Sequence, residues 1–370
     1  MTLVGNYARF DVEFVRGDGA TLYSSSGEAY LDFLCGLGVT NVGHCHPAVV
    51  AAIASQASSL LHVSNLFENE PMVALAGRLS SRTLGGGVLF ANSGAEAVEA
   101  ALKLARKRRR GGNVLVALRG FHGRTYGALS ATPQEAKQAP FAPLVPGFIA
   151  FAAEEIAGAV DGDTAAVLIE PLQGEGGVHP IDPSVLRAIR AACDERGALL
   201  IFDEVQTGMG RTGTLFAYEQ LGVVPDAMTV AKGLAGGLPI GALICSPAVT
   251  DVFQPGDHGS TFAGGPVQCA AALAVLDVVD DPDLLVRVRD LGERLREGLR
   301  ELPYVQSVRG LGLMVAAEVS VDAPALVRRA LLEQRLIINA TGPTTLRFLP
   351  PLIIDHSHVD DALTRLSRLA

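Results

Sequence analysis

The sequence predicts an α/β fold, with a large doubly wound domain on a mainly parallel sheet and a smaller α+β domain. In most of the chain, short and continuously apolar runs alternate with longer stretches of helical periodicity. That pattern is typical of buried parallel strands with helices on both faces. The 370 residues, 49% of them hydrophobic, are enough for two domains at about 150 residues each.

Six apolar runs are predicted to be strands of the large sheet. Several of them end at polar residues or glycine, and helical stretches such as Ala95–Arg109 and Pro183–Arg196 lie between them. We therefore expect the doubly wound region at about residues 45–250, within a large domain of residues 41–260. The predicted strands are Val88–Ala91, Val114–Leu118, Ala165–Ile169, Leu199–Phe202, Ala227–Val230 and Ile240–Ile244.

The pattern changes after Pro266. Two long helical stretches, Val267–Asp280 and Asp283–Leu302, are followed by short runs that resemble strands. We interpret residues 261–370 as a small C-terminal α+β domain, and we expect residues 1–40 to pack with it. The predicted strands of this domain are Val305–Arg309, Leu313–Glu318 and Leu346–Leu349.

Composition argues against several classes of protein. The formal net charge of −9 does not suit a protein that binds duplex nucleic acid. The basic run at 106–110 ends an amphipathic stretch and meets Gly111-Gly112, so it is interpreted as the C-terminus of a helix. No apolar run reaches the roughly 18 residues needed to cross a bilayer, and the N-terminus lacks the features of a signal peptide.

Cysteine and histidine usage points to a reducing compartment without a metal site. The five cysteines include no C-x-x-C pair, so we expect a cytoplasmic protein without a disulfide framework. His44-Cys45-His46 matches the spacing of no usual metal site, and we expect no bound metal.

Polar residues at the ends of the predicted strands are the first candidates for a functional site. In doubly wound sheets, ligands bind beyond the carboxyl ends of the strands. The residues at these ends are Asn92-Ser93-Gly94, Phe121-His122, Glu170, Asp203-Glu204 and Lys232.

Lys232 differs from the other three lysines of the chain. It follows the apolar run 227–231 and precedes a glycine-rich segment. Desolvation there would lower the pKa of its amine, and a neutral amine can form a Schiff base with an aldehyde. Position alone leaves this role and a salt-bridged structural lysine equally open.

Two further strand ends suit a bound cofactor. Asp203 or Glu204 could hold a proton on a pyridine nitrogen, although either could also cap the next helix. Ser93-Gly94-Ala95 opens a predicted helix whose free N–H groups suit a phosphate, and Ser93 with Glu96 also fits a capping box.

The segment Gly208–Gly213 matches G-x-G-x-x-G, a pattern found in dinucleotide-binding folds. That fingerprint requires an acid about 20 residues later at the end of a strand. The nearest candidate, Asp226, precedes its strand instead. The match is therefore weak support for a nicotinamide enzyme.

Taken together, the sequence blocks resemble the class III, fold-type-I pyridoxal-phosphate aminotransferases, nearly from end to end. One block alone would be weak, but the order of all of them makes chance agreement improbable. The blocks are Asn41–Pro47, Asn92–Ala97, Phe121–Arg124, Glu170–Val178, Asp203–Gly208, Ala231–Gly233, Gly259–Phe262 and Arg347–Pro351.

The resemblance implies a role for each matching residue. Lys232 would carry pyridoxal 5′-phosphate as a Schiff base and shuttle the proton, while Asp203 would face the pyridinium nitrogen. Ser260 and Thr261 would reach the phosphate of the neighbouring subunit, which implies a homodimer with shared active sites. The remaining implied cofactor contacts are Phe121 and Val205 on the two ring faces, Gln206 at the ring hydroxyl, His122 beside Phe121, and the backbone of Gly94 and Ala95 at the phosphate.

The same resemblance implies three substrate-binding residues. Arg124 would bind the carboxylate of the primary donor, because its guanidinium suits a bidentate contact. Glu175 and Arg347 would form a switch pair that opens when Arg347 receives the carboxylate of glutamate.

Within the family, the sequence most resembles the subgroup that acts on acetylornithine. Leu37 stands where ornithine aminotransferases carry a tyrosine, and an aliphatic residue suits a donor whose α-amine is acylated. The implied reaction moves the terminal amine of N2-acetyl-L-ornithine to 2-oxoglutarate, as in arginine biosynthesis. Gly265, where the family commonly has asparagine, and the segment Thr341–Thr344, which resembles relatives of lysine biosynthesis, depart from this subgroup.

Other activities stay open on the same motifs. Aminoadipate-semialdehyde, succinylornithine and 4-aminobutyrate aminotransferases share most of them. A pyridoxal-phosphate aminomutase would release no glutamate. A protein that only binds a ligand would need neither Lys232 nor Asp203.

Overall fold

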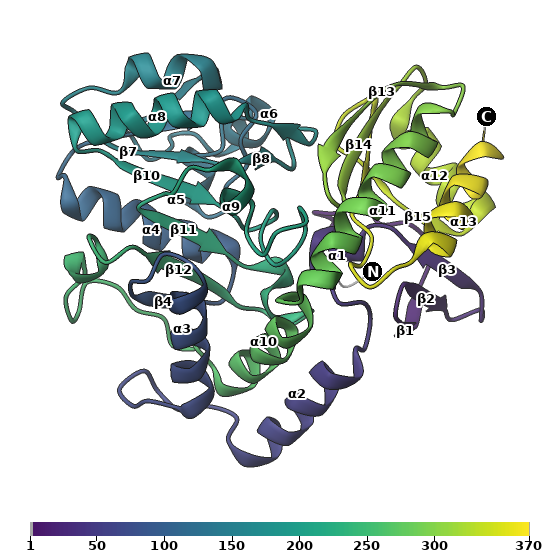
Figure 1. Cartoon of the computed structure of the whole chain (residues 1–370), viewed down its shortest axis with the longest axis horizontal. Coiled ribbons are helices and arrows are strands. Elements are labelled where there is room, and N and C mark those ends of the chain that lie inside the picture. The colour runs from purple at the N-terminus through teal and green to yellow at the C-terminus, as the bar shows by residue number, and fades with distance from the viewer. Residues whose placement is uncertain (1–2, 370) are drawn as a thin grey trace.

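A computed structural model describes residues 3–369 (Figure 1). Its largest sheet has seven strands in the order β4-β12-β11-β10-β7-β5-β6. All neighbours are parallel except β12, which is antiparallel to both β4 and β11. The strands are β4 (Val88–Ala91), β5 (Asn113–Ala117), β6 (Phe148–Phe151), β7 (Thr164–Ile169), β10 (Leu199–Asp203), β11 (Ala227–Val230) and β12 (Gly241–Cys245).

The mainly parallel sheet is confirmed, and the six predicted runs are strands with ends within one residue of those expected. The seventh strand, β6, was missed. It lies at the edge of the sheet, pairs only with β5, and is partly exposed along its length. Its apolar residues also run directly into helix α7 (Ala153–Ala159), so the sequence shows no break between the two elements.

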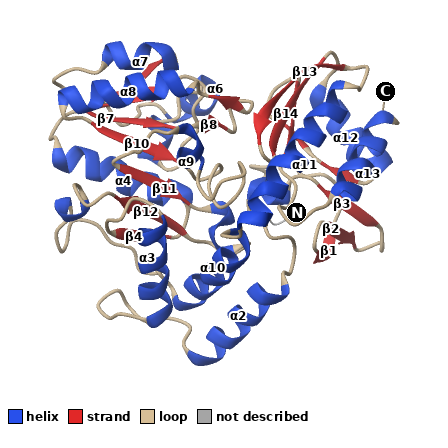
Figure 2. Ribbon diagram, viewed as in Figure 1, coloured by secondary structure: helices blue, strands red, loops and turns tan. Residues whose placement is uncertain are grey.

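Helices cover both faces of this sheet (Figure 2). Alternate strand residues such as Leu115 and Leu200 pack in one buried cluster with α7 and with α8 (Pro183–Arg196). The intervening residues, such as Val116 and Ile201, pack in a second cluster with α4 (Gly94–Arg108). This two-sided burial explains why the strands are continuously apolar in sequence.

The ends of α4 follow from local chemistry. The Glu96 N–H donates to Oγ of Ser93 at 3.2 Å, and Oε2 of Glu96 accepts from the N–H of Asn92 at 2.8 Å. The return bond of the expected capping box therefore reaches one residue further back than the box requires. Arg106, Lys107 and Arg108 occupy the last turn, as the basic run predicted.

The C-terminal third forms a four-stranded antiparallel sheet, in the order β13-β14-β17-β16, with three helices. A second sheet, β1-β2-β3-β15, joins the N-terminal segment to the C-terminal third, because β3 pairs in parallel with β15. The elements are β1 (Phe14–Asp18), β2 (Thr21–Ser24), β3 (Ala29–Asp32), β13 (Val305–Leu311), β14 (Met314–Val319), β15 (Leu336–Ile337), β16 (Asn339–Ala340), β17 (Thr345–Phe348), α11 (Pro282–Arg300), α12 (Ala323–Gln334) and α13 (His356–Ser367).

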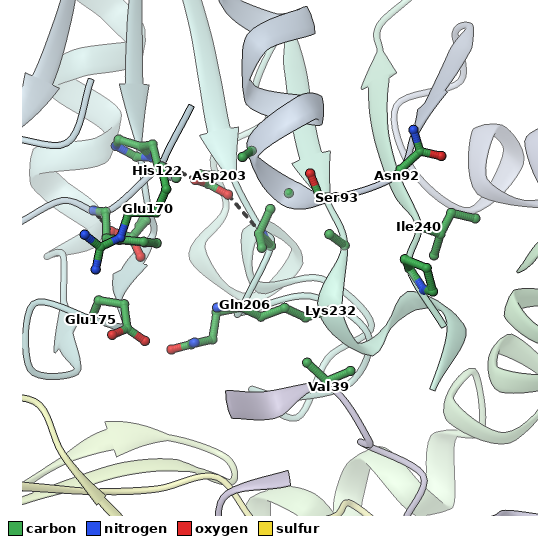
Figure 3. A pocket seen from close by; sticks show the side chains of 18 of the residues that line it. Val39, Asn92, Ser93, His122, Glu170, Glu175, Asp203, Gln206, Lys232 and Ile240 are labelled. Carbon is green, nitrogen blue, oxygen red and sulfur yellow. Dashed lines mark hydrogen bonds and ion pairs between the residues drawn. The ribbon is translucent and has the colours of Figure 1, made fainter. Parts of the chain in front are cut away.

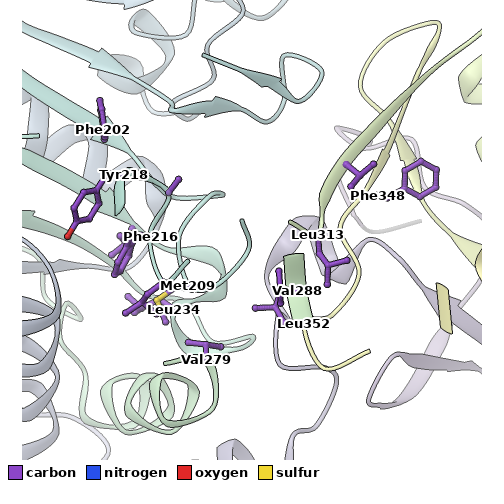
Figure 4. Packing of buried hydrophobic residues seen from close by; sticks show 14 of the residues in the cluster. Phe202, Met209, Phe216, Tyr218, Leu234, Val279, Val288, Leu313, Phe348 and Leu352 are labelled. Atoms are coloured by element: carbon purple, nitrogen blue, oxygen red, sulfur yellow. The ribbon is translucent and has the colours of Figure 1, made fainter. Parts of the chain in front are cut away.

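The packing partners of the chain change between α10 (Pro266–Val279) and α11. Helix α10 packs against α2 (Pro47–Ser59) and α3 (Glu70–Arg82), whereas α11 packs against β13 and β14. Buried side chains from both parts meet in one apolar cluster, which includes Met209 and Leu352 (Figure 4). The domain boundaries at 40 and 260 remain predictions.

Short elements complete the chain. Among residues 3–369, no helix combines the length and apolar character needed to cross a bilayer. The short elements are α1 (Cys35–Gly38), α5 (Tyr126–Ser130), α6 (Glu135–Gln138), α9 (Ala217–Leu221), the hairpin strands β8 (Leu172–Gln173) and β9 (His179–Pro180), and 3-10 turns at Ala139–Phe141, Lys232–Ala235 and Thr250–Val252.

Candidate active site

A cavity of about 470 Å³ lies at the carboxyl ends of the parallel strands (Figure 3). Its wall combines side chains from β5, β7, β10 and β11 ends with the N-terminus of α4. Ten of the residues expected in a site line it: Gly94, Ala95, Phe121, His122, Arg124, Glu175, Asp203, Val205, Gln206 and Lys232.

Lys232 follows β11 in a strained conformation. Its φ is +41°, a region that residues other than glycine seldom adopt. Burial lowers the pKa of its amine, while the charge of Glu175 acts in the opposite direction. Lys232 therefore presents an amine that loses its proton more readily than an exposed lysine does.

Asp203 is the best-anchored acid in the cavity. It ends β10 and is buried, and its Oδ2 lies 2.7 Å from Nδ1 of His122. Its Oδ1 accepts hydrogen bonds from Oγ1 of Thr229 at 2.9 Å and from the N–H of Val205 at 3.1 Å. Three donors from three segments thus fix one carboxylate in place.

His122 is bound tightly to that carboxylate. Burial alone would lower the pKa of His122, but the hydrogen bond and charge of Asp203 raise it above its usual value. A protonated or Nδ1-protonated imidazole donates to Asp203, while its buried Nε2 has no partner among the described residues. The sequence placed His122 in the site without predicting this contact.

Glu204, the acid next to Asp203, points away from the cavity. Its carboxylate accepts from the backbone N–H groups of Ala217 and Tyr218 at 2.9 and 2.8 Å, and from Oγ1 of Thr207 at 2.7 Å. It therefore satisfies the first turn of α9. Of the two roles considered for this pair, the structure gives the helix-capping role to Glu204.

The N-terminus of α4 lies at one end of the cavity. Ser93, Gly94 and Ala95 line the wall there, and the unpaired N–H groups of a first helical turn favour an anion. A Cβ at position 94 would lie 2.8 Å from Cγ1 of Val205. Glycine therefore lets the helix approach Val205 closely.

Glu175 and Arg347 form an ion pair between the two parts of the chain. Nη1 of Arg347, on β17, donates to Oε1 of Glu175 at 2.7 Å and to Oε1 of Gln206 at 3.1 Å. Burial alone would raise the pKa of Glu175, but Arg347 and Lys232 hold it below its usual value. Nε2 of Gln206 is buried and has no partner among residues 3–369.

Glu170 joins two loops of the cavity wall. It directly follows β7, and its two oxygens accept from the N–H groups of Phe121 at 2.9 Å and of Gly174 at 3.1 Å. Burial raises the pKa of this carboxyl group to about 7. The sequence marked Glu170 as a strand-end residue and gave it no role.

Four expected site residues lie outside the cavity wall. Arg347 stands behind Glu175, and Leu37 lies in α1 with 41% of its surface exposed. Oγ of Ser260 lies 2.8 Å from Nδ2 of Asn92, and the neighbouring Thr261 is exposed. Within a single chain, Ser260 therefore contacts the wall residue Asn92 from behind, and neither Ser260 nor Thr261 lines the cavity.

Some wall residues were not predicted. Val39 and the segment 237–240 also line the cavity, and Thr229 supports Asp203. Thr229 did leave a signal in the sequence, because it is the only polar residue in the run 227–231. Val39 and Leu238 carried no such signal.

The dinucleotide-like and metal-like motifs have structural roles. Arg211 of the segment 208–213 is buried, and its Nη1 donates to the carbonyl of Leu313 at 3.0 Å. Asp226 accepts from the N–H of Leu200, and Nε2 of His44 lies 2.7 Å from Oδ2 of Asp32. No group of three potential metal ligands occurs within residues 3–369.

The fold and the cavity define an α/β protein that brings a lysine of lowered pKa, an anchored carboxylate and a helix N-terminus together. Residues 4–369 match the family described as aminotransferase class-III. The chain therefore belongs to the class III aminotransferases.

Individual relatives agree with this assignment. The acetylornithine aminotransferase of Caldanaerobacter subterraneus subsp. tengcongensis is 48% identical, over 98% of this chain and 95% of its own. The structure of N-acetylornithine aminotransferase from Stenotrophomonas maltophilia K279a is 35% identical with a TM-score of 0.85, over 98% and 96% of the two chains. The ornithine aminotransferase of Toxoplasma gondii, crystallised with oxidised glutathione and with partial occupancy of PLP at its active site, is 35% identical with a TM-score of 0.94, over 100% and 92%. These neighbours confirm the fold-type-I architecture.

Proposed function

We propose that this chain binds pyridoxal 5′-phosphate and transfers the terminal amino group of N2-acetyl-L-ornithine to 2-oxoglutarate, giving N-acetylglutamate 5-semialdehyde and glutamate in arginine biosynthesis. The observation that carries the proposal is the convergence of Lys232, the anchored Asp203 and the N-terminus of α4 in one cavity. Acetylornithine aminotransferases among the relatives support the donor. PLP in the Toxoplasma enzyme supports the cofactor.

The residues of the cavity fit this cofactor. The first turn of α4 suits its phosphate, and the buried carboxylate of Asp203 suits a protonated ring nitrogen. The unpartnered Nε2 of Gln206 offers a donor to the ring hydroxyl. Phe121 and Val205 both line the cavity and would enclose the ring.

When bound, pyridoxal phosphate supplies an aldehyde that condenses with amines and a ring that accepts electrons from the substrate. Asp203 would keep the proton on the ring nitrogen, and His122 and Thr229 would hold Asp203 in position. The Lys232 amine would take the proton from the substrate carbon and return it to the cofactor C4′ atom, a task that suits its lowered pKa.

Arg124 and the Glu175–Arg347 pair would let one cavity bind both the amino donor and the dicarboxylate substrate. Arg124 is exposed at the rim of the cavity and would bind the carboxylate of the donor. Arg347 would stay paired with Glu175 in that half of the reaction. It would release Glu175 when it binds the side-chain carboxylate of glutamate or 2-oxoglutarate.

A panel of donors tests the proposed substrate. The protein loaded with pyridoxal phosphate is given 2-oxoglutarate and one donor at a time, and glutamate formation is measured. We expect N-acetylornithine to be used at least about tenfold better in kcat/KM than free ornithine, because Leu37 offers no polar partner to a free α-ammonium. Preference for ornithine, succinylornithine, 4-aminobutyrate or an aminoadipate-type donor would contradict the proposed donor, while the proposed aminotransferase reaction would stand. No glutamate from any donor would favour an aminomutase.

We also propose a cytoplasmic homodimer with shared active sites. Leu61, Leu66, Phe67 and Phe262 are 64–86% exposed, and a second copy of the chain would cover such apolar surface. Thr261 lies next to this surface, where it could reach the phosphate of a partner. The five free thiols fit a reducing compartment.

A further inference from the structure

Lys137 is a cation beside the cavity that no step of the proposed reaction uses. It lies in α6, is half-buried, and its Nζ is 5.5 Å from the centroid of the Phe121 ring. Cζ of Arg124 lies 5.6 Å from the same centroid. Lys137 donates a hydrogen bond to Oε1 of Gln134, and no carboxylate within residues 3–369 forms an ion pair with it.

The segment that carries Lys137 is fixed to the loops around Glu175. Nε2 of Gln134 donates to the carbonyls of Arg119 and Gly120 at 3.2 and 3.1 Å. The Arg119 carbonyl in turn packs on Gly176, where a Cβ would lie only 2.6 Å from its oxygen. Gln134, one turn before Lys137, is therefore linked through Arg119 to the loop that presents Glu175 to the cavity.

The charges of Lys137 and Glu175 affect each other's pKa. Burial and the charge of Arg124 lower the pKa of Lys137, and Glu175 opposes that shift. Lys137 in turn contributes to the lowered pKa of Glu175. Lys137 and Glu175 thus attract each other electrostatically, although no hydrogen bond or ion pair joins them within residues 3–369.

Opening of the Glu175–Arg347 pair would leave the Glu175 carboxylate without its counter-ion, and Lys137 is a second cation near it. When Arg347 binds the carboxylate of glutamate or 2-oxoglutarate, Glu175 loses its ion-pair partner while largely buried. An unpaired buried carboxylate is strongly unfavourable. Lys137 has a flexible four-carbon stem, and its ammonium group contacts one amide oxygen and the face of the Phe121 ring, so it can move to a new acceptor.

We propose that Lys137 is the alternative counter-ion of Glu175, a positioning residue that stabilises the open switch while Arg347 holds the dicarboxylate substrate. This inference rests on the proposed aminotransferase function. It assigns Lys137 to the glutamate half of the reaction only, because Glu175 keeps Arg347 as its partner in the other half.

The test separates the two halves of the reaction. In the loaded enzyme, Lys137→Met should raise the KM for 2-oxoglutarate about five- to tenfold and leave the KM for N-acetylornithine within about twofold. Lys137→Arg should restore the 2-oxoglutarate KM, because it restores the charge. Lys107→Met, which removes an exposed lysine at the end of α4, is the matched control and should change neither KM.

Equilibrium binding gives a readout that does not need turnover. Glutarate is a five-carbon dicarboxylate without a reactive carbonyl, and Lys137→Met should weaken its Kd by the same factor. In a Glu175→Gln background, where no charge is left unpaired, Lys137→Met should have no further effect on that Kd. If the wild type makes no glutamate from N-acetylornithine, the proposed donor fails, but glutarate binding still tests Lys137. An equal rise of both KM values, unchanged glutarate binding, or an undiminished effect in the Glu175→Gln background would overturn the inference.

Discussion

At the scale of single residues, the site depends on whether each side chain at the end of a strand points into the cavity or away from it. Asp203 points into the cavity and binds His122, whereas Glu204 turns away and binds the backbone of α9. Position alone left both roles open for both acids, because each is an acid at the end of the same apolar run, and only the family resemblance singled out Asp203. The contacts between His122 and Asp203, 81 residues apart, and between Glu175 and Arg347, 172 residues apart, depend on tertiary structure that spacing does not reveal.

Asp203→Asn tests the role of the anchored carboxylate. The change keeps the shape but removes the charge that would hold a proton on the cofactor ring. We expect kcat to fall by about 10²-fold or more with cofactor still bound, measured as glutamate formation at saturating substrate. Thr229→Val removes only one of the hydrogen bonds to Asp203, and its kcat should fall by about tenfold or less. Equal activity of Asp203→Asn and wild type would contradict this role.

At the scale of elements, the prediction was most accurate where burial was complete. Five of the six predicted strands of the large sheet are buried on both faces, and the edge strand β4 is half buried, so their runs stand out in sequence. Strands β1, β2 and β3, helices α12 and α13, and the two-residue strands β15 and β16 were not predicted. The missed strands are short, and β1 is mostly exposed, so neither length nor alternation distinguished them from loops.

The N-terminus of α4 can be tested through its first residue. Gly94→Ala would place a Cβ 2.8 Å from Cγ1 of Val205, so the first turn or Val205 must move. We expect the Kd for pyridoxal phosphate, measured by fluorescence titration of the apoprotein, to rise about tenfold or more. Gly158→Ala in α7 is the control, because a Cβ there meets nothing within 4 Å. If both variants bind the cofactor like the wild type, the close approach at Gly94 does not matter for binding.

The pH dependence of stability reports on the buried cap of α9. Burial raises the pKa of Glu204 to about 7, so the fold favours its protonated form. The stability from this group is complete below its ordinary pKa of 4.5 and is lost as the pH rises through about 7. As the pH rises from 5 to 8, the wild type should therefore lose stability relative to Glu204→Gln, because glutamine does not titrate. The difference in Tm between the two proteins should change by an amount equivalent to about 1–3 kcal/mol. A Tm difference that is constant with pH would show that Glu204 does not titrate in this range.

At the scale of the whole molecule, the two parts of the chain meet at the site, and the proposed dimer would add residues of a second copy. Arg347 comes from the C-terminal sheet, whereas its partners Glu175 and Gln206 follow strands of the large sheet, so their meeting depends on the packing seen in Figure 4. Neither Ser260 nor Thr261 lines the cavity of its own chain. The proposed dimer explains why a resemblance would mark both positions as cofactor contacts.

Complementation tests the shared site. Lys232→Ala chains are mixed with chains that carry Ser260→Ala and Thr261→Val, after partial unfolding and refolding to exchange subunits. In a shared site, half of the dimers are mixed and one of their two sites is intact, so activity should return to about a quarter of the wild-type level. Activity that never exceeds the sum of the two separate variants, or a monomer by light scattering, would contradict the shared dimer.

The most direct test of the central claim is to find which lysine holds the cofactor. The chain has only Lys103, Lys107, Lys137 and Lys232, so peptide masses can distinguish all four. The loaded protein is reduced with borohydride and digested, and each lysine peptide is weighed. We predict that the mass of the reduced cofactor is found on the Lys232 peptide alone. A label on another lysine, or no label on a protein that had bound pyridoxal phosphate, would contradict the proposed function.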